Sequence, residues 1–365
     1  MILTSRTRAR RGFTLVELMV AASMCVLGMW LFTWLYKQGL DSFRTAKAQA
    51  DLMAQERSVI ELLRRDLSAD HFLDEDNKPN RGRKLSDQLR TLGPGYTVPR
   101  GGYFETFTPL PVGPAIEPVD SDSFGSWRAN DAGAAWRPNH ALRFTVVRPG
   151  GTPANQYSVQ TPAGGGQQYG GVGAEVAYFL VQSGRTPGGV PLFDLYRRQR
   201  LVALNSDYAA AYNGLLASNT AATIADAREV FALSNPNATS GPPQVATFAQ
   251  LSASANAALR VPLPSAANPQ PVNQIPGRFG DDKILSNVVS FELKYTGTRG
   301  PTATAPFPAL FANNSDYPYD WLPTTNNALD TGNNPQLRLT GVHVRLRVWN
   351  PKTLHARQTS VVVDL

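Results

Sequence analysis

One acidic residue, Glu17, stands inside a long apolar stretch near the N-terminus. From Phe13 to Tyr36 the chain carries no other charged side chain. A carboxylate inside a membrane helix costs about 3 kcal/mol on insertion scales and usually has a partner. Cleavage of the chain after Gly12 supplies one, because Phe13 then carries a free α-ammonium. The chemistry that these residues suggest is therefore peptide-bond cleavage followed by pairing of a carboxylate with an amino terminus.

The apolar stretch predicts a membrane-spanning helix. At about 1.5 Å per residue, 13–36 is about 36 Å long, enough to cross a hydrocarbon core of about 30 Å. The flanking basic residues are Arg6, Arg8, Arg10 and Arg11. They predict that the short N-terminus stays in the cytoplasm and that the rest is exported. An ordinary secretory signal fits less well, because the apolar run continues well past Ala21-Ala22-Ser23.

The segment Gly12-Phe13-Thr14-Leu15-Val16-Glu17 resembles the class III signal of type IV pilins and type II secretion pseudopilins. The resemblance implies that a prepilin peptidase cleaves between Gly12 and Phe13, removing a leader of residues 1–12. It also implies N-methylation of Phe13. Glu17 is then expected to neutralise the amino terminus of a neighbouring subunit during assembly.

The remaining motifs do not predict catalysis, and we expect no enzyme activity, cofactor or metal. The histidines are His71, His140, His343 and His355, and none has zinc-ligand spacing. The glycine-rich stretch 164–173 is followed by a strand-like run rather than by a helix, which favours a hairpin connection over a phosphate loop. Asp281-Asp282 and the acidic cluster 74–76 could offer calcium ligands, but no twelve-residue calcium loop is present, so solvated turns are favoured.

The composition narrows the classes of partner. The net charge is +7, and the four leader arginines account for four of these charges, leaving +3. So small a surplus does not indicate a nucleic-acid-binding protein. The single cysteine, Cys25, lies in the membrane segment, so disulfides and cysteine-ligated metals are excluded from the exported part.

A second helical segment, 37–69, follows the membrane segment. Its predicted buried face consists of Leu40, Phe43, Ala46, Ala50, Met53, Ile60, Leu63 and Leu67. The predicted polar positions include Arg44, Lys47, Asp51, Glu56, Arg57, Glu61 and Arg64. We expect this amphipathic half to pack under a sheet.

Residues 70–365 are predicted to form the exported β-rich domain. Strands are expected from 141, over 175–181, within 192–204, from 284, and in a C-terminal hairpin with a turn at 350–353. Residues 70–140 have no regular pattern. Insertions at about 205–280 and 297–337 are expected to be surface excursions, the first with a short helix at 223–233. The row His343, Arg345 and Arg347 predicts a solvated edge strand or a contact with an acidic neighbour.

The expected fold class is therefore α+β, with a long N-terminal helix packed on antiparallel β-sheet. The order of strands is similar to large minor subunits, the J-type pseudopilin or the W-type minor pilin. This resemblance implies a bacterial inner-membrane protein with its C-terminal domain in the periplasm. It would assemble through its N-terminal helix into, or prime, a type IV pilus or type II secretion pseudopilus. The implied partners are other pilin or pseudopilin subunits, the prepilin peptidase and an inner-membrane assembly platform. A membrane-anchored binding protein or adhesin using the 297–337 loop is the alternative.

Overall fold

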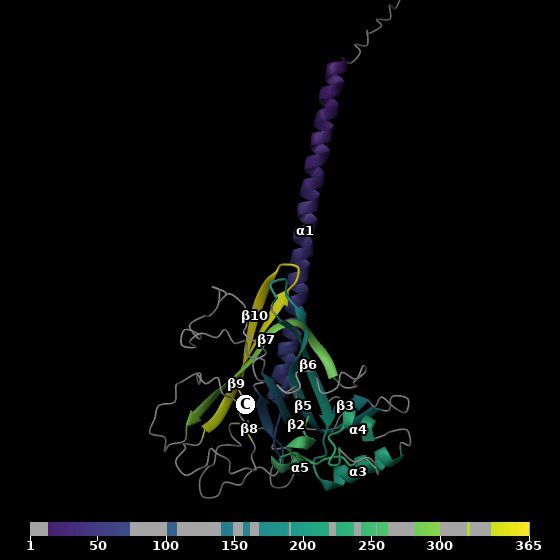
Figure 1. Ribbon diagram of the computed structural model, residues 1–365, viewed down its shortest axis with the longest axis vertical. Helices are drawn as coiled ribbons and strands as arrows, with labels where there is room; N and C mark the ends of the chain where they lie inside the picture. The colour runs from purple at the N-terminus through teal and green to yellow at the C-terminus, as the bar shows by residue number, and fades with distance from the viewer. Residues whose placement is uncertain are drawn as a thin grey trace, which may run out of the picture. The chain divides into compact units, whose positions relative to one another are not determined.

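The fold is described from a computed structural model (Figure 1). The residues that it describes are 14–73, 101–107, 140–148, 156–160, 168–189, 191–218, 224–236, 242–252, 254–261, 281–299, 320–321 and 337–364. The chain divides into two compact units, Met1–Ala54 and Gln55–Leu365, and each is described by itself.

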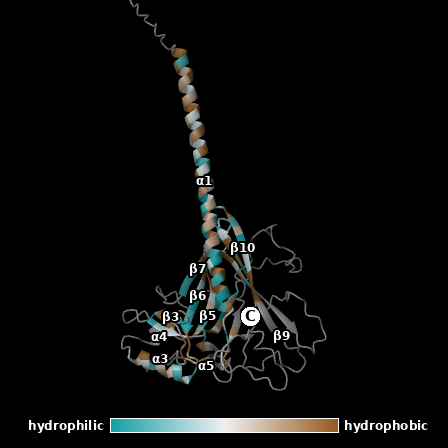
Figure 2. Ribbon diagram, turned by 180° about the vertical axis from the view of Figure 1, so that it is seen from behind, coloured by the Kyte–Doolittle hydropathy of each residue, from teal (hydrophilic) through white to brown (hydrophobic). Residues whose placement is uncertain are grey.

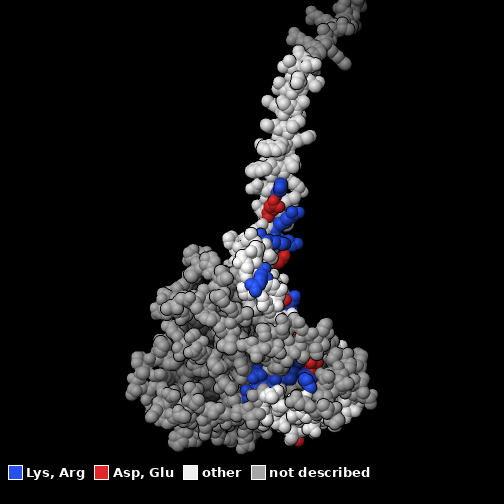
Figure 3. Space-filling view, in the orientation of Figure 1, with Lys and Arg blue, Asp and Glu red and all other residues white. Residues whose placement is uncertain are grey.

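The first unit contains most of helix α1, which spans Leu15–Leu67. Its N-terminal part is long and apolar enough to cross a membrane, judged by length and composition. Hydrophobic colours predominate there (Figure 2), and Lys and Arg side chains appear only farther along the helix (Figure 3). Large apolar side chains such as Met29, Trp30 and Phe32 are exposed in the isolated chain. Such a surface is stable only in lipid or against other apolar helices.

The second unit is built on an antiparallel sheet with the strand order β10-β9-β7-β6-β5-β2-β1-β8. The strands of this sheet are β1 (Phe104–Phe107), β2 (Ala141–Val147), β5 (Gly173–Arg185), β6 (Pro191–Leu201), β7 (Asp281–Arg299), β8 (Asp320–Trp321), β9 (Leu337–Asn350) and β10 (His355–Asp364). A separate two-stranded sheet pairs β3 (Tyr157–Gln160) with β4 (Gln168–Gly171). Together with α1, this arrangement confirms the predicted α+β class with antiparallel sheet.

The last turns of α1 pack on the large sheet. Val59, Leu63 and Leu67 are buried at three- to four-residue steps, which places them on one helical face. Polar contacts mark the path of the helix across the strands. Glu56 meets β10, Asp66 meets β5 and β6, and His71, just after the helix, meets β2. The helix therefore crosses the sheet from its edge toward its middle.

The predicted buried face of this helix is partly wrong. Leu63 and Leu67 are buried, but Leu40, Phe43 and Met53 are exposed. Glu56, expected on the polar face, is 2% exposed. The residues of α1 that are buried in the second unit are those that contact the sheet. They include the carboxylates Glu56 and Asp66, which bind partners on the sheet.

The first insertion also differs from the expected surface excursion. It contains helices α3 (Ser206–Ser218), α4 (Ile224–Val230) and α5 (Phe248–Ser252), with a 3-10 helix, Ser254–Leu259. Phe248 and Leu251 of α5 join a buried cluster with Tyr103 and Val147. Short bridges connect the insertion to the end of β6, such as Leu201 with Phe231. The insertion supplies core side chains because its apolar residues pack beside the ends of β2 and β6. Residues 262–280 lie outside the described residues.

Most predicted strands are present, with two differences. The segment 70–140 was expected to be irregular, but it contributes β1. The row His343, Arg345 and Arg347 lies on β9, which is not an edge strand because it pairs with both β7 and β10. Its residues are half-buried, and Arg345 pairs with Glu292 at 3.3 Å. The 297–337 loop lies largely outside the described residues.

Candidate processing and assembly site

The first turn of α1 contains a reciprocal set of hydrogen bonds between Thr14 and Glu17. The backbone N–H of Thr14 donates to Glu17 Oε2 at 3.0 Å, and the Thr14 hydroxyl donates to the same oxygen at 3.1 Å. In return, the backbone N–H of Glu17 lies 3.2 Å from Thr14 Oγ1. This is a capping box, in which two side chains satisfy amide groups that the helix leaves without partners.

The capping box explains how a carboxylate is accommodated at the start of an apolar helix. Glu17 accepts two hydrogen bonds from its own chain, and it lies where the helix dipole is positive. Both bonds use Oε2, so Oε1 remains available for a cation. The sequence signal for this arrangement is Thr-x-x-Glu before an apolar run, which was not among the predicted motifs.

Gly12 and Phe13 lie outside the described residues, so the structure does not place the predicted cleavage site. It places Glu17 three residues after Thr14, in the first turn of the helix. Gly12, Phe13 and Glu17 thus lie close together in the sequence, at the N-terminal end of the apolar segment.

Residues 7–32 match the family model described as the prokaryotic N-terminal methylation motif. The chain has a prepilin-type N-terminus. The motif supports the type IV pilin and pseudopilin class, and it implies processing by prepilin peptidase and assembly with pilin-type subunits. Neither the comparison with curated proteins nor the one with solved structures finds a match.

The prepilin-type motif and the apolar part of α1 overlap along the chain. Residues 7–32 cover the first turns of the helix, including Thr14 and Glu17. A prepilin signal followed by the one helix of spanning length among the described residues fits a membrane-anchored, single-pass protein.

A second polar cluster joins the C-terminal end of α1 to the sheet. The Asp66 carboxylate is buried, and its Oδ2 accepts hydrogen bonds from Tyr178 Oη and Arg197 Nε, both at 2.7 Å. Burial alone would lower the pKa of Arg197, but the adjacent Asp66 charge raises it. Burial and the same negative charge raise the pKa of Tyr178 well above its usual value. The cluster is thus an aspartate–arginine ion pair with a neutral tyrosine donor.

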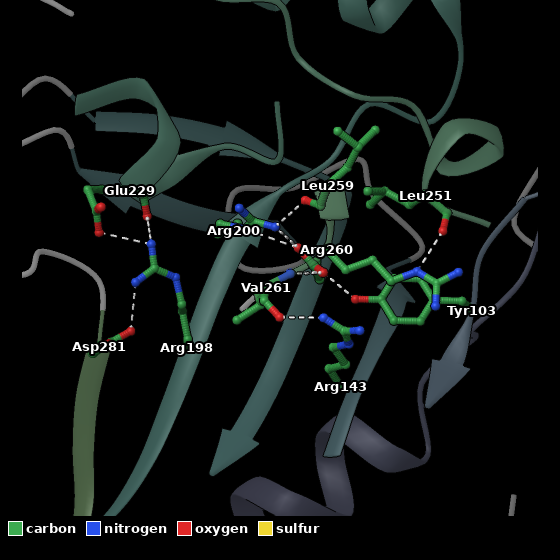
Figure 4. A network of polar contacts seen from close by, with 11 residues as sticks. Tyr103, Arg143, Arg198, Arg200, Glu229, Leu251, Leu259, Arg260, Val261 and Asp281 are labelled. Atoms are coloured by element: carbon green, nitrogen blue, oxygen red, sulfur yellow. Dashed lines mark hydrogen bonds and ion pairs between the residues drawn. The ribbon is translucent and has the colours of Figure 1, made fainter. Parts of the chain in front are cut away.

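A third cluster fastens the insertion to the sheet (Figure 4). Glu175 Oε2 is 2.5 Å from Arg200 Nη2, and Glu175 Oε1 accepts from the backbone N–H of Val261 at 2.7 Å. Tyr103 Oη also donates to Glu175 Oε1. Burial opposes the charge of this carboxylate, but the Arg200 guanidinium and the hydrogen bonds lower the pKa of Glu175 overall.

Two further arginines bind carbonyl oxygens of the same insertion. Arg143 Nη1 donates to Val261 O at 2.6 Å, and Arg260 Nε donates to Leu251 O at 3.0 Å. The Arg260 guanidinium also lies over the Tyr103 ring, 4.4 Å from its centre. The Arg143 bond fixes the end of the insertion on β2, and the Arg260–Tyr103 contact adds to it, whereas the Arg260–Leu251 bond lies within the insertion.

Arg198 makes a separate bridge in the same region. It binds Glu229 and Asp281, each at 2.9 Å, and so connects α4 with the start of β7 (Figure 4). Within the part of the chain that the structure describes, no group of three or more His, Cys, Asp or Glu could hold a metal ion. The buried charges described here bind one another and backbone carbonyls, an arrangement that stabilises the fold.

Proposed function

We propose that the protein is a minor pilin or pseudopilin subunit that enters, or primes, a type IV pilus or type II secretion pseudopilus. The observation that carries the proposal is the prepilin-type motif at residues 7–32, placed on the apolar start of α1. The folded β-rich unit at the other end of the chain supports it, since a filament subunit needs an exported domain.

In this proposal, processing and assembly act on the same few residues. The peptidase cleaves between Gly12 and Phe13, and Phe13 becomes the N-methylated terminus. The new α-ammonium of one subunit then pairs with Glu17 of a neighbour. In apolar surroundings the attraction between opposite charges is strong. It offsets the free-energy cost of removing both charges from water only when the two groups are in contact. Glu17 Oε1 is the oxygen that the capping box leaves for this pair.

The proposed cellular location of the protein is the inner membrane, with the N-terminus in the cytoplasm and the sheet domain in the periplasm. The Asp66 cluster then holds the last turns of α1 on the sheet, and the Glu175 cluster holds the insertion on the sheet. Both filament systems use the same N-terminal chemistry, so the proposal covers both. The adhesin alternative depends on the 297–337 loop, most of which lies outside the described residues, and no observation favours it.

The proposal is tested by the mass of the membrane-bound protein. Expressed with a prepilin peptidase, the wild-type chain should begin at N-methylated Phe13. Gly12→Val should retain the leader, because the peptidase must accommodate a small residue before the scissile bond, whereas Gly12→Ala should be cleaved at least partly. A mature terminus at Met1 or Ser23 in the wild type would contradict the proposal.

A further inference from the structure

The C-terminal end of α1 is capped by a buried histidine. His71 is 2% exposed, and its Nε2 lies 2.9 Å from the carbonyl oxygen of Leu67, the last residue of the helix. Carbonyls in the last turn of a helix have no partner within the helix. The His71 ring therefore supplies a partner that the helix itself cannot.

The other ring nitrogen of His71 contacts the sheet. Nδ1 lies 2.9 Å from the carbonyl oxygen of Thr145 on β2. The backbone is held at the same point, because Thr145 Oγ1 donates to His71 O at 2.9 Å. The rings of Phe104 and Phe144 meet the imidazole edge to face, with centres 5.4 and 5.0 Å away. One side chain thus connects the end of the helix with a central strand in an apolar setting.

The two carbonyl contacts make this junction sensitive to the proton count of the ring. A neutral imidazole has one N–H, so it donates to one carbonyl only. A protonated ring can donate to both, but a cation must then be held in a fully buried, largely aromatic site. The free energy gained from one more hydrogen bond, even with a charged donor, is smaller than the cost of burying a charge without a dedicated counter-ion.

The charged groups around His71 do not supply such a counter-ion. From α1, the nearest is Asp66, and its carboxylate already pairs with Arg197 of β6 and accepts from Tyr178 of β5. The contacts from β2 and β1 described above are a carbonyl and phenyl rings. Consistent with this balance, burial lowers the pKa of His71, although the two carbonyls and Asp66 favour the protonated form.

We propose that His71 is a proton-sensitive latch, neutral when α1 is docked on the sheet, whose protonation loosens the end of the helix from β2. The sign follows from linkage. A histidine whose pKa is lower in the docked state than in the open state binds its proton preferentially in the open state. Docking is then strongest above the ordinary histidine pKa of about 6.5, and it weakens as pH falls below it. The latch does not depend on the filament function proposed above.

Hydrogen exchange of the full-length protein in nanodiscs tests the latch. After correction for intrinsic rates, peptides covering 63–73 and 141–147 should open up to about fivefold more readily at pH 5.5 than at pH 6.5. Between pH 7.5 and 6.5 the change should be small. In His71→Gln, where the side chain does not titrate, the change below pH 6.5 should disappear.

Variants of two other histidines test whether the acid-dependent opening comes from His71. His355 is exposed on β10, and His140 accepts the Leu293 N–H at Nδ1. Both His355→Gln and His140→Gln should keep the acid-dependent opening of 63–73. The proposal is overturned if His140→Gln abolishes it instead. The wild-type profile alone overturns it if protection of these peptides is unchanged or increases on acidification, since the protonated ring would then be the docked form.

Discussion

Two carboxylates of α1, Glu56 and Asp66, are buried against the sheet, and they differ in how well they are paired. Asp66 has two short hydrogen bonds from the sheet. Glu56 Oε2 accepts from Thr359 Oγ1 at 2.8 Å and lies 3.2 Å from Arg357 Nε, but Glu56 Oε1 is buried without a partner. Asp66 is therefore the stronger of the two polar contacts that hold the helix.

Asp66→Asn should destabilise the second unit by about 3 kcal/mol, because it leaves the Arg197 guanidinium buried without its counter-ion. Denaturant unfolding of the detergent-solubilised protein, followed by tryptophan fluorescence, measures this change. The matched control is Glu61→Gln, which breaks the exposed pair with Arg64 and should cost less than about 1 kcal/mol. Equal effects of the two variants would show that Asp66 is not an anchor.

Thr14→Val should weaken the start of α1, because it removes the hydroxyl that donates to Glu17 and accepts from its N–H. Loss of such a cap costs about 1 kcal/mol, which corresponds to roughly fivefold faster amide exchange in the first turn. Thr14→Ser keeps the hydroxyl and should exchange like the wild type. If Thr14→Val also exchanges like the wild type in nanodiscs, the capping box does not form in the membrane.

Single residues were predictable from the sequence where their type conflicted with their surroundings. Glu17 was identified because a charge interrupts an apolar run. Glu56 and Asp66 were not, because a charged residue on a helix that leaves the membrane is ordinarily solvent-facing. Their partners, Thr359 and Arg197, are far away in the sequence. Only the fold brings them together.

The side chains of helix α1 are exposed along most of its length and buried in its last turns, which pack on the sheet. Leu63 is fully buried, whereas Leu40, on the same predicted face, is 37% exposed. Leu63→Ala should lower the free energy of unfolding by about 2–5 kcal/mol through lost burial and a cavity. Leu40→Ala should change it by less than about 1 kcal/mol. A similar loss for both in denaturant unfolding would mean that Leu40 is also buried in the domain.

Strands and helices were predictable where their apolar residues form a clear periodic pattern in the sequence. The C-terminal hairpin alternates apolar and polar residues, and it forms β9 and β10 in register from Asn350 and His355 onward. Helix α3 was missed because it lies in the stretch 205–280, whose Ala-, Asn-, Ser- and Pro-rich composition is typical of a surface loop. Its buried residues, Ala209, Tyr212 and Leu216, do recur at helical spacing.

The molecule as a whole combines an apolar segment that cannot remain in water with a unit whose buried charges are paired within it. The first part fits membrane anchoring and filament assembly. The stability of the second unit depends on three polar contacts to α1, at Glu56, Asp66 and His71, and on the Glu175 cluster that holds the insertion. The fold class and the prepilin signal were predictable from local sequence. The core role of the insertion was not, because it depends on long-range contacts such as Glu175 with Val261.

The proposed role of Glu17 is to drive assembly by pairing with the amino terminus of a neighbouring subunit. It is tested by photo-crosslinking from position 25, where the exposed Cys25 is replaced by a photoreactive residue in the full-length chain in its native membrane. With Glu17 present, crosslinks to other pilin-type subunits should form. With Glu17→Gln the chain should still be cleaved, N-methylated and membrane-inserted, but these crosslinks should fall severalfold, whereas Glu17→Asp should retain part of them. Undiminished crosslinking by a correctly processed Glu17→Gln chain would contradict the account.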